Sequence, residues 1–187
     1  MDEIGIKLIE EYVKPALLAI KNSGAYAPLL SILNILSEEG MCSSVLGTHN
    51  ELSRVLSQIT IAQHSYFVAY TMLQRFQQSA SWEPQLRSTT PQILISGLGH
   101  DLGKIPRYSS PCHGRGRYDH AIVSANVVAD VFCNHNSSPP WLAMVLQAIR
   151  IHHSDYEVKN NYLQKLLRRA DWEARMIEAR RIKGTII

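Results

Sequence analysis

The chain has 187 residues, of which 45% are hydrophobic and 19% charged, and its formal net charge is +3. This length and composition exclude a disordered chain and suit one globular domain, whose mild positive charge does not by itself argue for DNA binding. No apolar run reaches the about 20 residues of a membrane span and the N-terminus lacks a signal-peptide core, so we expect a cytoplasmic protein.

Apolar residues recur at helical spacing along most of the chain, and no run of useful length alternates as a strand would. Pro15 marks the first turn of the first predicted helix or a kink in it, Gly40 ends the second, and Pro91 suits the first turn of a later one. The predicted fold class is therefore all-α. The helices are predicted at about residues 13–20, 29–40, 51 onward, 59–78, 91–101, 119–133, 140–153 and 162–181.

Two connecting segments separate these predicted helices. Residues 79–90 indicate a loop or a short helix between loops, and residues 103–118 form a long connection rich in Gly, Pro and Ser. A connection of the second length inside a compact domain is often functional. Residues 1–50 are predicted to be an N-terminal helical extension on a domain formed by residues 51–187, or to form one continuous bundle with it.

Several predicted helices carry a histidine or an aspartate on their apolar stripe. His64, His120 and Asp171 each lie three or four residues from an apolar residue of the stripe, and His152 and His153 extend the stripe of another helix. An imidazole or carboxylate that faces a core is costly unless it is paired or coordinates a metal. Each residue alone could be a satisfied core histidine or half of a buried ion pair. Together they indicate a shared site in the core of the bundle.

His100 and Asp101 are adjacent, so on a helix their side chains diverge by about 100°. Both can reach one ion only if it sits close to the backbone or at the end of the helix. Gly97, Gly99 and Gly103 surround the pair, and glycine permits such a close approach. The segment ISGLGHDLGKIP therefore indicates a site more strongly than an isolated His-Asp pair does.

In the order of His64, the His100-Asp101 pair and Asp171, the sequence resembles the HD-domain phosphohydrolase superfamily. The segment HDLGKIP is similar to the HD-GYP branch of cyclic-dinucleotide phosphodiesterases, although the GYP tripeptide is absent. The resemblance covers about residues 61–180. It implies an HD-domain helical bundle in which residues 51–187 form the metal-dependent phosphohydrolase domain.

The resemblance also implies the ligands of one or two divalent metal ions. Imidazole and carboxylate ligands without thiolate suit Mn, Fe, Co, Ni, Zn or Mg, among which the sequence does not choose. A site that holds only one ion remains an alternative. The first ion would be held by His64, His100, Asp101 and Asp171, and the second by the bridging Asp101, by His120 and by His152 or His153.

Asp101 and Lys104 are the predicted catalytic residues. By the resemblance, Lys104 would contact the substrate phosphate or balance charge in the transition state. His113, Arg115 and Arg117 in the long connection could also bind a phosphate, or could belong to a merely soluble basic loop. The arginines of the last helix are expected on a solvated face, and Trp172 is expected in packing.

The implied function is that of a phosphomonoesterase or phosphodiesterase acting on a nucleotide or a cyclic dinucleotide. The alternative is a non-catalytic HD-type ligand-sensing or regulatory module, although such modules usually lack metal ligands that this chain keeps. A third hypothesis is an accessory domain for nucleic-acid processing, but the sequence contains no basic-aromatic motif to support it. We therefore expect a small phosphorylated partner and neither a nucleic acid nor a membrane; a homodimer stays open.

Overall fold

The computed structural model describes residues 3–45, 50–78, 82–109, 119–154 and 161–184. Within these ranges the chain is all-α, as predicted, with one isolated antiparallel bridge between Ser43 and Thr60. None of the described helices is both long and apolar enough to cross a membrane. The elements in chain order are α1 (Glu3–Leu8), η1 (Ile9–Val13), α2 (Leu17–Asn22), α3 (Tyr26–Glu39), α4 (Glu51–Leu56), α5 (Ile61–Gln77), α6 (Trp82–Gly99), η2 (Leu102–Lys104), α7 (Asp119–Asn134), α8 (Leu142–Arg150) and α9 (Tyr162–Ile182).

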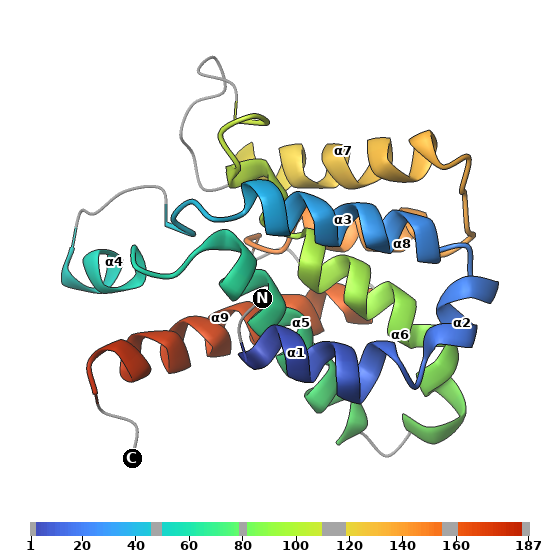
Figure 1. Cartoon of the computed structure of the whole chain (residues 1–187), viewed down its shortest axis with the longest axis horizontal. Coiled ribbons are helices and arrows are strands. Elements are labelled where there is room, and N and C mark those ends of the chain that lie inside the picture. The colour runs from blue at the N-terminus through green and yellow to red at the C-terminus, as the bar shows by residue number, and fades with distance from the viewer. Residues whose placement is uncertain (1–2, 46–49, 79–81, 110–118, 155–160, 185–187) are drawn as a thin grey trace.

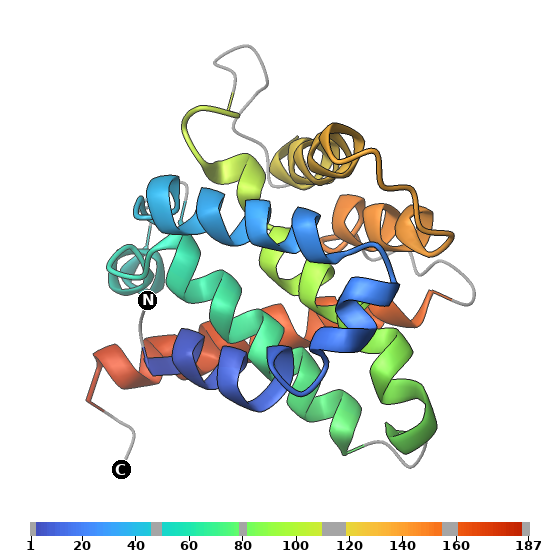
Figure 2. The same ribbon diagram turned by 45° about the vertical axis from the view of Figure 1, so that its right-hand side comes forward.

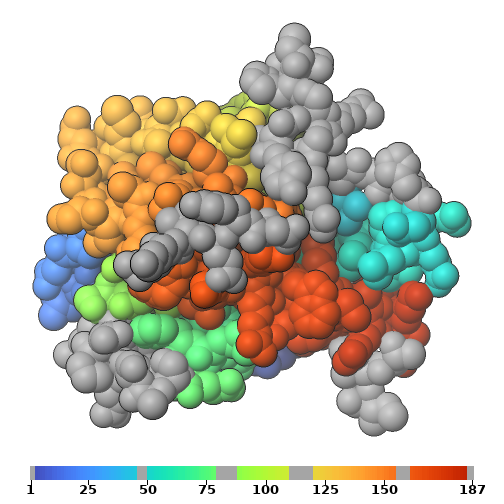
Figure 3. Space-filling view, turned by 180° about the vertical axis from the view of Figure 1, so that it is seen from behind, coloured from blue at the N-terminus to red at the C-terminus, as the bar shows by residue number. Residues whose placement is uncertain are grey.

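Helices α5 and α6 pack against each other at the centre of the bundle (Figure 1). Helix α9 packs on α5, α8 packs on α6, and α7 covers α8 and η2. Helix α3 lies between α7 at the top and α1 at the bottom of the views in Figures 1 and 2. Seen from behind, α9 runs from the region of α8 toward α4 (Figure 3). The five helices α5 to α9 therefore enclose one common interior.

The hydrophobic core extends from the N-terminal helices into the rest of the bundle. Ile20 and Ile32 are fully buried in the same apolar cluster as Leu73, Ile95 and Leu167. Complete burial of such a side chain contributes about 1.5–3 kcal/mol. The helices before residue 50 therefore pack on the same core as the helices after it, while the division into an extension and a domain stays a prediction.

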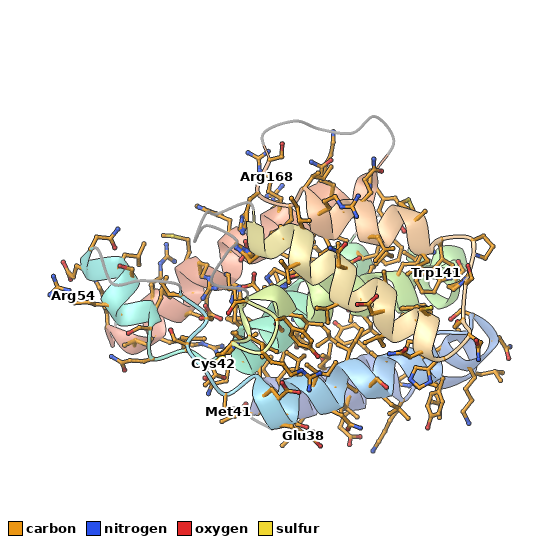
Figure 4. All side chains as sticks on the ribbon, turned by 90° about the horizontal axis from the view of Figure 1, so that it is seen from above. Glu38, Met41, Cys42, Arg54, Trp141 and Arg168 are labelled. Carbon is orange, nitrogen blue, oxygen red and sulfur yellow. The ribbon has the colours of Figure 1, made fainter. Side chains whose placement is uncertain are left out.

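Hydrogen bonds fix the segment after α3 against the start of α5. Thr60 caps α5, because its Oγ1 accepts from the N–H of Gln63 and its own N–H donates to Gln63 Oε1. The N–H of Ser44 donates to the carbonyl of Ile59 at 2.9 Å, and the N–H of Ile61 donates to the carbonyl of Cys42 at 2.9 Å. Figure 4 labels Cys42 at the end of α3, where this segment crosses to α5. A segment with no predicted role is thus held next to the helix that carries His64.

Helix α6 differs most from its prediction. It begins at Trp82, so Pro91 lies inside the helix instead of in its first turn. Proline removes one helical hydrogen bond, but Ile93, Leu94 and Ile95 beyond it are fully buried and hold the helix in place. Tertiary packing therefore overrides the local signal of the proline.

Two other boundaries also differ from the prediction. Pro15 lies between η1 and α2, so it separates two short helices, the first of which belongs to a helical segment starting at Glu3. Helix α8 ends at Arg150, and His152 and His153 lie in the turn that follows it. The gap between Gln77 and Trp82 includes residues 79–81, which lie outside the described ranges.

Candidate metal centre

The seven predicted metal-ligand side chains meet in the interior between α5, the end of α6, the start of α7, the turn after α8, and α9. Within each of three overlapping groups, the candidate ligand atoms lie within 4.8 Å of one another. Asp101, His100 and His152 each belong to two of these groups. The bridging position that the resemblance implies for Asp101 stays a prediction. The groups are His64 with His100 and Asp101; Asp101 with His120, His152 and His153; and His100 with His152 and Asp171.

Glycines bring the elements of the centre close together. A Cβ atom on Gly97 would lie 2.6 Å from the Cα of Ala69, so α6 can approach α5 this closely only with glycine there. A Cβ atom on Gly103 would lie 2.3 Å from the carbonyl oxygen of His120. The close contact at Gly97 places His100 near α5, and the close contact at Gly103 places Asp101 near the start of α7.

His64 links α5 to α9. It is completely buried, its Nε2 lies 3.0 Å from Oδ1 of Asp171, and its Nδ1 lies 2.9 Å from Oε1 of Glu178. A carboxylate that accepts from one ring nitrogen orients the imidazole and leaves the other nitrogen for a ligand. Asp171 and Glu178 are seven residues apart, so they share one face of α9.

Asp101 lies at the middle of the cluster and is 1% exposed. Its Oδ1 lies 3.3 Å from Nε2 of His120, and its Oδ2 lies 3.5 Å from Nε2 of His100 and 3.8 Å from Nε2 of His64. Nε2 of His120 also lies 2.9 Å from Nε2 of His153. Nitrogen and oxygen atoms from α5, the end of α6, α7 and the turn after α8 therefore lie within a few ångströms of one another.

Several of these buried atoms have no hydrogen-bond partner among the described residues: Nε2 of His100, Nε2 of His152 and Oδ1 of Asp101. The other nitrogen of each of these two rings donates to a backbone carbonyl, of Gly97 at 2.9 Å and of Ile149 at 2.6 Å. That arrangement leaves Nε2 as a lone-pair acceptor in both rings. Burying such atoms unpaired is costly, and a metal ion would satisfy all of them, so the residues present fit a divalent ion.

The electrostatics keep most of these groups in the form that binds a metal. Burial lowers the pKa of His100, burial and the neighbouring His153 lower the pKa of His152 well below its usual range, and burial lowers the pKa of His153 to about 4. Burial opposes ionisation of Asp101, but Lys104, His100 and His120 together outweigh it and hold the pKa of that carboxyl well below its usual range. Neutral imidazoles and ionised carboxylates are what metal coordination requires.

His64 and Asp171 behave as a pair. Burial and Arg175 act to lower the pKa of His64, but the carboxylates of Glu178 and Asp171 outweigh them and raise it. Burial acts to raise the pKa of Asp171, and His64 more than offsets this and holds it well below its usual range. A protonated His64 therefore lies between the carboxylates of Asp171 and Glu178, and its positive charge offsets theirs where a metal cation would otherwise do so.

The predicted substrate-binding residues fall into two groups. Lys104 is at the site: its Nζ lies 2.6 Å from Oδ2 of Asp101 and 3.2 Å from the carbonyl oxygen of Ser44, and its side chain is 10% exposed. His113, Arg115 and Arg117 lie outside the described residues.

The structure adds residues that the sequence reasoning missed, and it corrects two predictions. Arg175 was predicted on a solvated face, but its side chain is 18% exposed and contacts Ser44 and Glu178. Trp172 was predicted in packing, but it is 63% exposed. Glu178 could have been found, because it lies four residues after Ala174 on the apolar stripe of α9, whereas nothing in the local sequence singles out Ser44.

Comparison with known proteins identifies one family. The family model of the HD domain matches residues 61–180, a range that contains all seven predicted metal ligands. Ser44, the helices α1 to α4 and η1 lie before the match. No curated protein and no solved structure matches the chain.

Proposed function

The chain belongs to the HD-domain family, whose members are generally metal-dependent hydrolases, and we propose that it hydrolyses a phosphate ester with the help of divalent metal ions. One observation supports the proposal most strongly. Seven histidine and aspartate side chains converge in the core, and four of their buried nitrogen and oxygen atoms have no hydrogen-bond partner among the described residues. A purely structural cluster would satisfy those atoms with protein groups.

The proposed ligands form two sets that share Asp101. His64, His100 and Asp171 would complete the first set, and His120 with His152 or His153 would complete the second. A single ion is enough for the proposal, and a second ion depends on the second set. When bound, such an ion supplies a Lewis acid that withdraws charge from the phosphoryl group. The metal can be Mn, Fe, Co, Ni, Zn or Mg, since all of them accept imidazole and carboxylate ligands.

The chain itself would contribute orientation, charge and exclusion of water. Glu178 holds the ring of His64 in one orientation, and the carbonyls of Gly97 and Ile149 do the same for His100 and His152. The ammonium group of Lys104 lies at the edge of the cluster, where it can stabilise negative charge on phosphoryl oxygens. The complete burial of His64 and His100 places them in a region of low dielectric constant, which would strengthen each of these interactions.

The proposed substrate is a nucleotide or a cyclic dinucleotide. The HDLGKIP segment supports this class by its similarity to the HD-GYP branch. Trp172 adds support, because it follows Asp171 on α9 and presents an exposed indole on which a base can stack. Arg168, labelled in Figure 4, precedes Trp172 by four residues and so shares its face of α9.

Hydrolysis assays test the proposal. The protein loaded with Mn, Fe or Zn should release p-nitrophenol from p-nitrophenyl phosphate or from bis-p-nitrophenyl phosphate. Asp101→Ala should abolish this activity, because it removes the carboxylate shared by both ligand sets. Asp130→Ala is the matched control, since Asp130 lies on α7 in a surface groove between α3 and α7, away from the cluster, and should stay active. Retained activity in Asp101→Ala would refute the site, and tight nucleotide binding without turnover by the wild type would favour a non-catalytic ligand-sensing module.

A further inference from the structure

Two basic side chains from different elements approach the same carboxylate oxygen at the edge of the metal centre. Nζ of Lys104, on η2, lies 2.6 Å from Oδ2 of Asp101, and Nη2 of Arg175, on α9, lies 3.6 Å from the same atom. Their side chains are 10% and 18% exposed, whereas His64 and His100 are fully buried. The two cations therefore lie on the side of the cluster that solvent, and a substrate, can reach.

Ser44 holds both cations in place. Its carbonyl oxygen lies 3.2 Å from Nζ of Lys104 and 3.1 Å from Nη2 of Arg175, and its Oγ accepts from Nη1 of Arg175 at 2.7 Å. Ser44 is itself completely buried, and its N–H donates to the carbonyl of Ile59 just before α5. One residue, fixed to the helix that carries His64, thus orients two positive charges that come from separate parts of the chain.

The guanidinium group of Arg175 keeps donors available. Of its five N–H groups, two bond to Ser44 and one to Glu178, whose Oε2 lies 3.3 Å from Nη1. Within the described part of the chain, the remaining two have only longer contacts. Nη2 lies 3.6 Å from Asp101 and Nε lies 4.0 Å from Asp171, both beyond hydrogen-bond distance. Arg175 is thus held in place by Ser44 and Glu178, and its two remaining N–H donors face the predicted metal ligands Asp101 and Asp171.

The charge of the centre favours an anion once a metal is present. Three carboxylates, of Asp101, Asp171 and Glu178, face the two cations of Lys104 and Arg175, which leaves one net negative charge with the histidines neutral. One divalent ion would reverse that sign, and two would make it strongly positive. A dianionic phosphoryl group is the substrate moiety that such a site attracts most.

We propose that Lys104 and Arg175 together bind the phosphoryl oxygens of the substrate, and that Ser44 is a positioning residue for both. This inference rests on the proposed function and names the anion subsite within it. It also gives a role to a segment before the matched family region, because Ser44 precedes residue 61. The competing role for Arg175 is structural: it would only neutralise the carboxylates of Asp171 and Glu178.

The test measures binding of inorganic phosphate to the metal-loaded full chain by calorimetry, with metal content measured in parallel. Arg175→Met should weaken phosphate binding about 10–100-fold, because it removes charge-assisted hydrogen bonds, and should leave the metal content unchanged. Ser44→Ala should weaken it less, about 3–10-fold, because the carbonyl acceptor remains and only the Oγ contact is lost. Arg169→Met is the matched control on the same helix, since Arg169 is exposed and pairs with Glu173, and it should bind phosphate as the wild type does.

Equal phosphate affinity in the wild type and Arg175→Met would overturn the inference and leave the proposed function standing. Loss of metal from Arg175→Met would also overturn it, in favour of the structural role. Should that variant fail to fold, Arg175→Lys and Ser44→Ala decide instead: normal phosphate binding in both would overturn the inference. A wild type that binds no metal and hydrolyses no ester would refute the proposed function, and the same phosphate comparison on that protein would still decide whether Arg175 binds an anion.

Discussion

Glu178→Ala is the sharpest test of how the centre is organised, because Glu178 is not itself a predicted metal ligand and yet orients one, His64. Its carboxylate is 4% exposed and lies 2.9 Å from Nδ1 of His64 and 3.3 Å from Nη1 of Arg175. Loss of a carboxylate that orients a ligating histidine lowers metal affinity by about 10–100-fold, or about 1.4–2.7 kcal/mol. The unpaired donors left behind should also lower the free energy of unfolding by about 1–3 kcal/mol.

The assay titrates the protein with Zn or Mn in competition with a chromophoric chelator and records thermal unfolding of the same samples. Glu173→Ala is the matched control: Glu173 lies on the same helix and pairs with Arg75 and Arg169, so its loss should affect stability but not metal affinity. Glu178→Gln keeps an oxygen for the His64 N–H and should lie between the wild type and Glu178→Ala. Unchanged metal affinity in Glu178→Ala, together with normal affinity in Glu173→Ala, would refute the view that His64 is a ligand held by Glu178.

Four further changes test separate parts of the account. Lys104→Ala should keep the metal content and lose most turnover, measured as kcat beside elemental analysis; loss of metal would show that Lys104 is structural. Gly97→Ala should lower the free energy of unfolding by about 1–3 kcal/mol in denaturant titrations, because the new Cβ would lie 2.6 Å from the Cα of Ala69; a neutral effect would contradict the close contact of α5 with α6. Metal at about 100 times its Kd should stabilise the fold by about 2.7 kcal/mol, seen as a rise in Tm that a chelator reverses, and an unchanged Tm would argue against a site in the native core. Trp172→Ala should raise KM for a nucleotide substrate but not for p-nitrophenyl phosphate, and equal effects on both would exclude stacking of a base.

Much of the metal centre is predictable from the sequence because helical periodicity is a local property. His64 and Asp171 fall on apolar stripes, so their inward positions follow from spacing alone, and the structure places Nε2 of the fully buried His64 3.0 Å from Oδ1 of the partly buried Asp171. The adjacent His100 and Asp101 could be assigned only through the surrounding glycines and the resemblance to the HD domain. The match to that family over residues 61–180 confirms the superfamily and the all-α fold.

The remaining features depend on contacts that no local pattern encodes. Ser44 lies in a segment without periodicity, and its position follows from the hydrogen bond that its N–H donates to the carbonyl of Ile59, just before α5. In the sequence, Arg175 is one more basic residue of a charged helix. Its inward position depends on its hydrogen bonds to Ser44 and Glu178. Pro91 carries a strong local signal that the burial of α6 overrides, so the start of that helix was predicted wrongly.

The metal content of the purified protein, compared with that of Asp101→Ala, tests the central claim most directly. Elemental analysis should find about one to two transition-metal equivalents per chain in the wild type and in the control Asp130→Ala, and almost none in Asp101→Ala, because Asp101 contributes to both ligand sets. No metal in the wild type, even after anaerobic loading with Mn and Fe, would contradict the account and leave an HD-type fold that serves as a non-catalytic binding module.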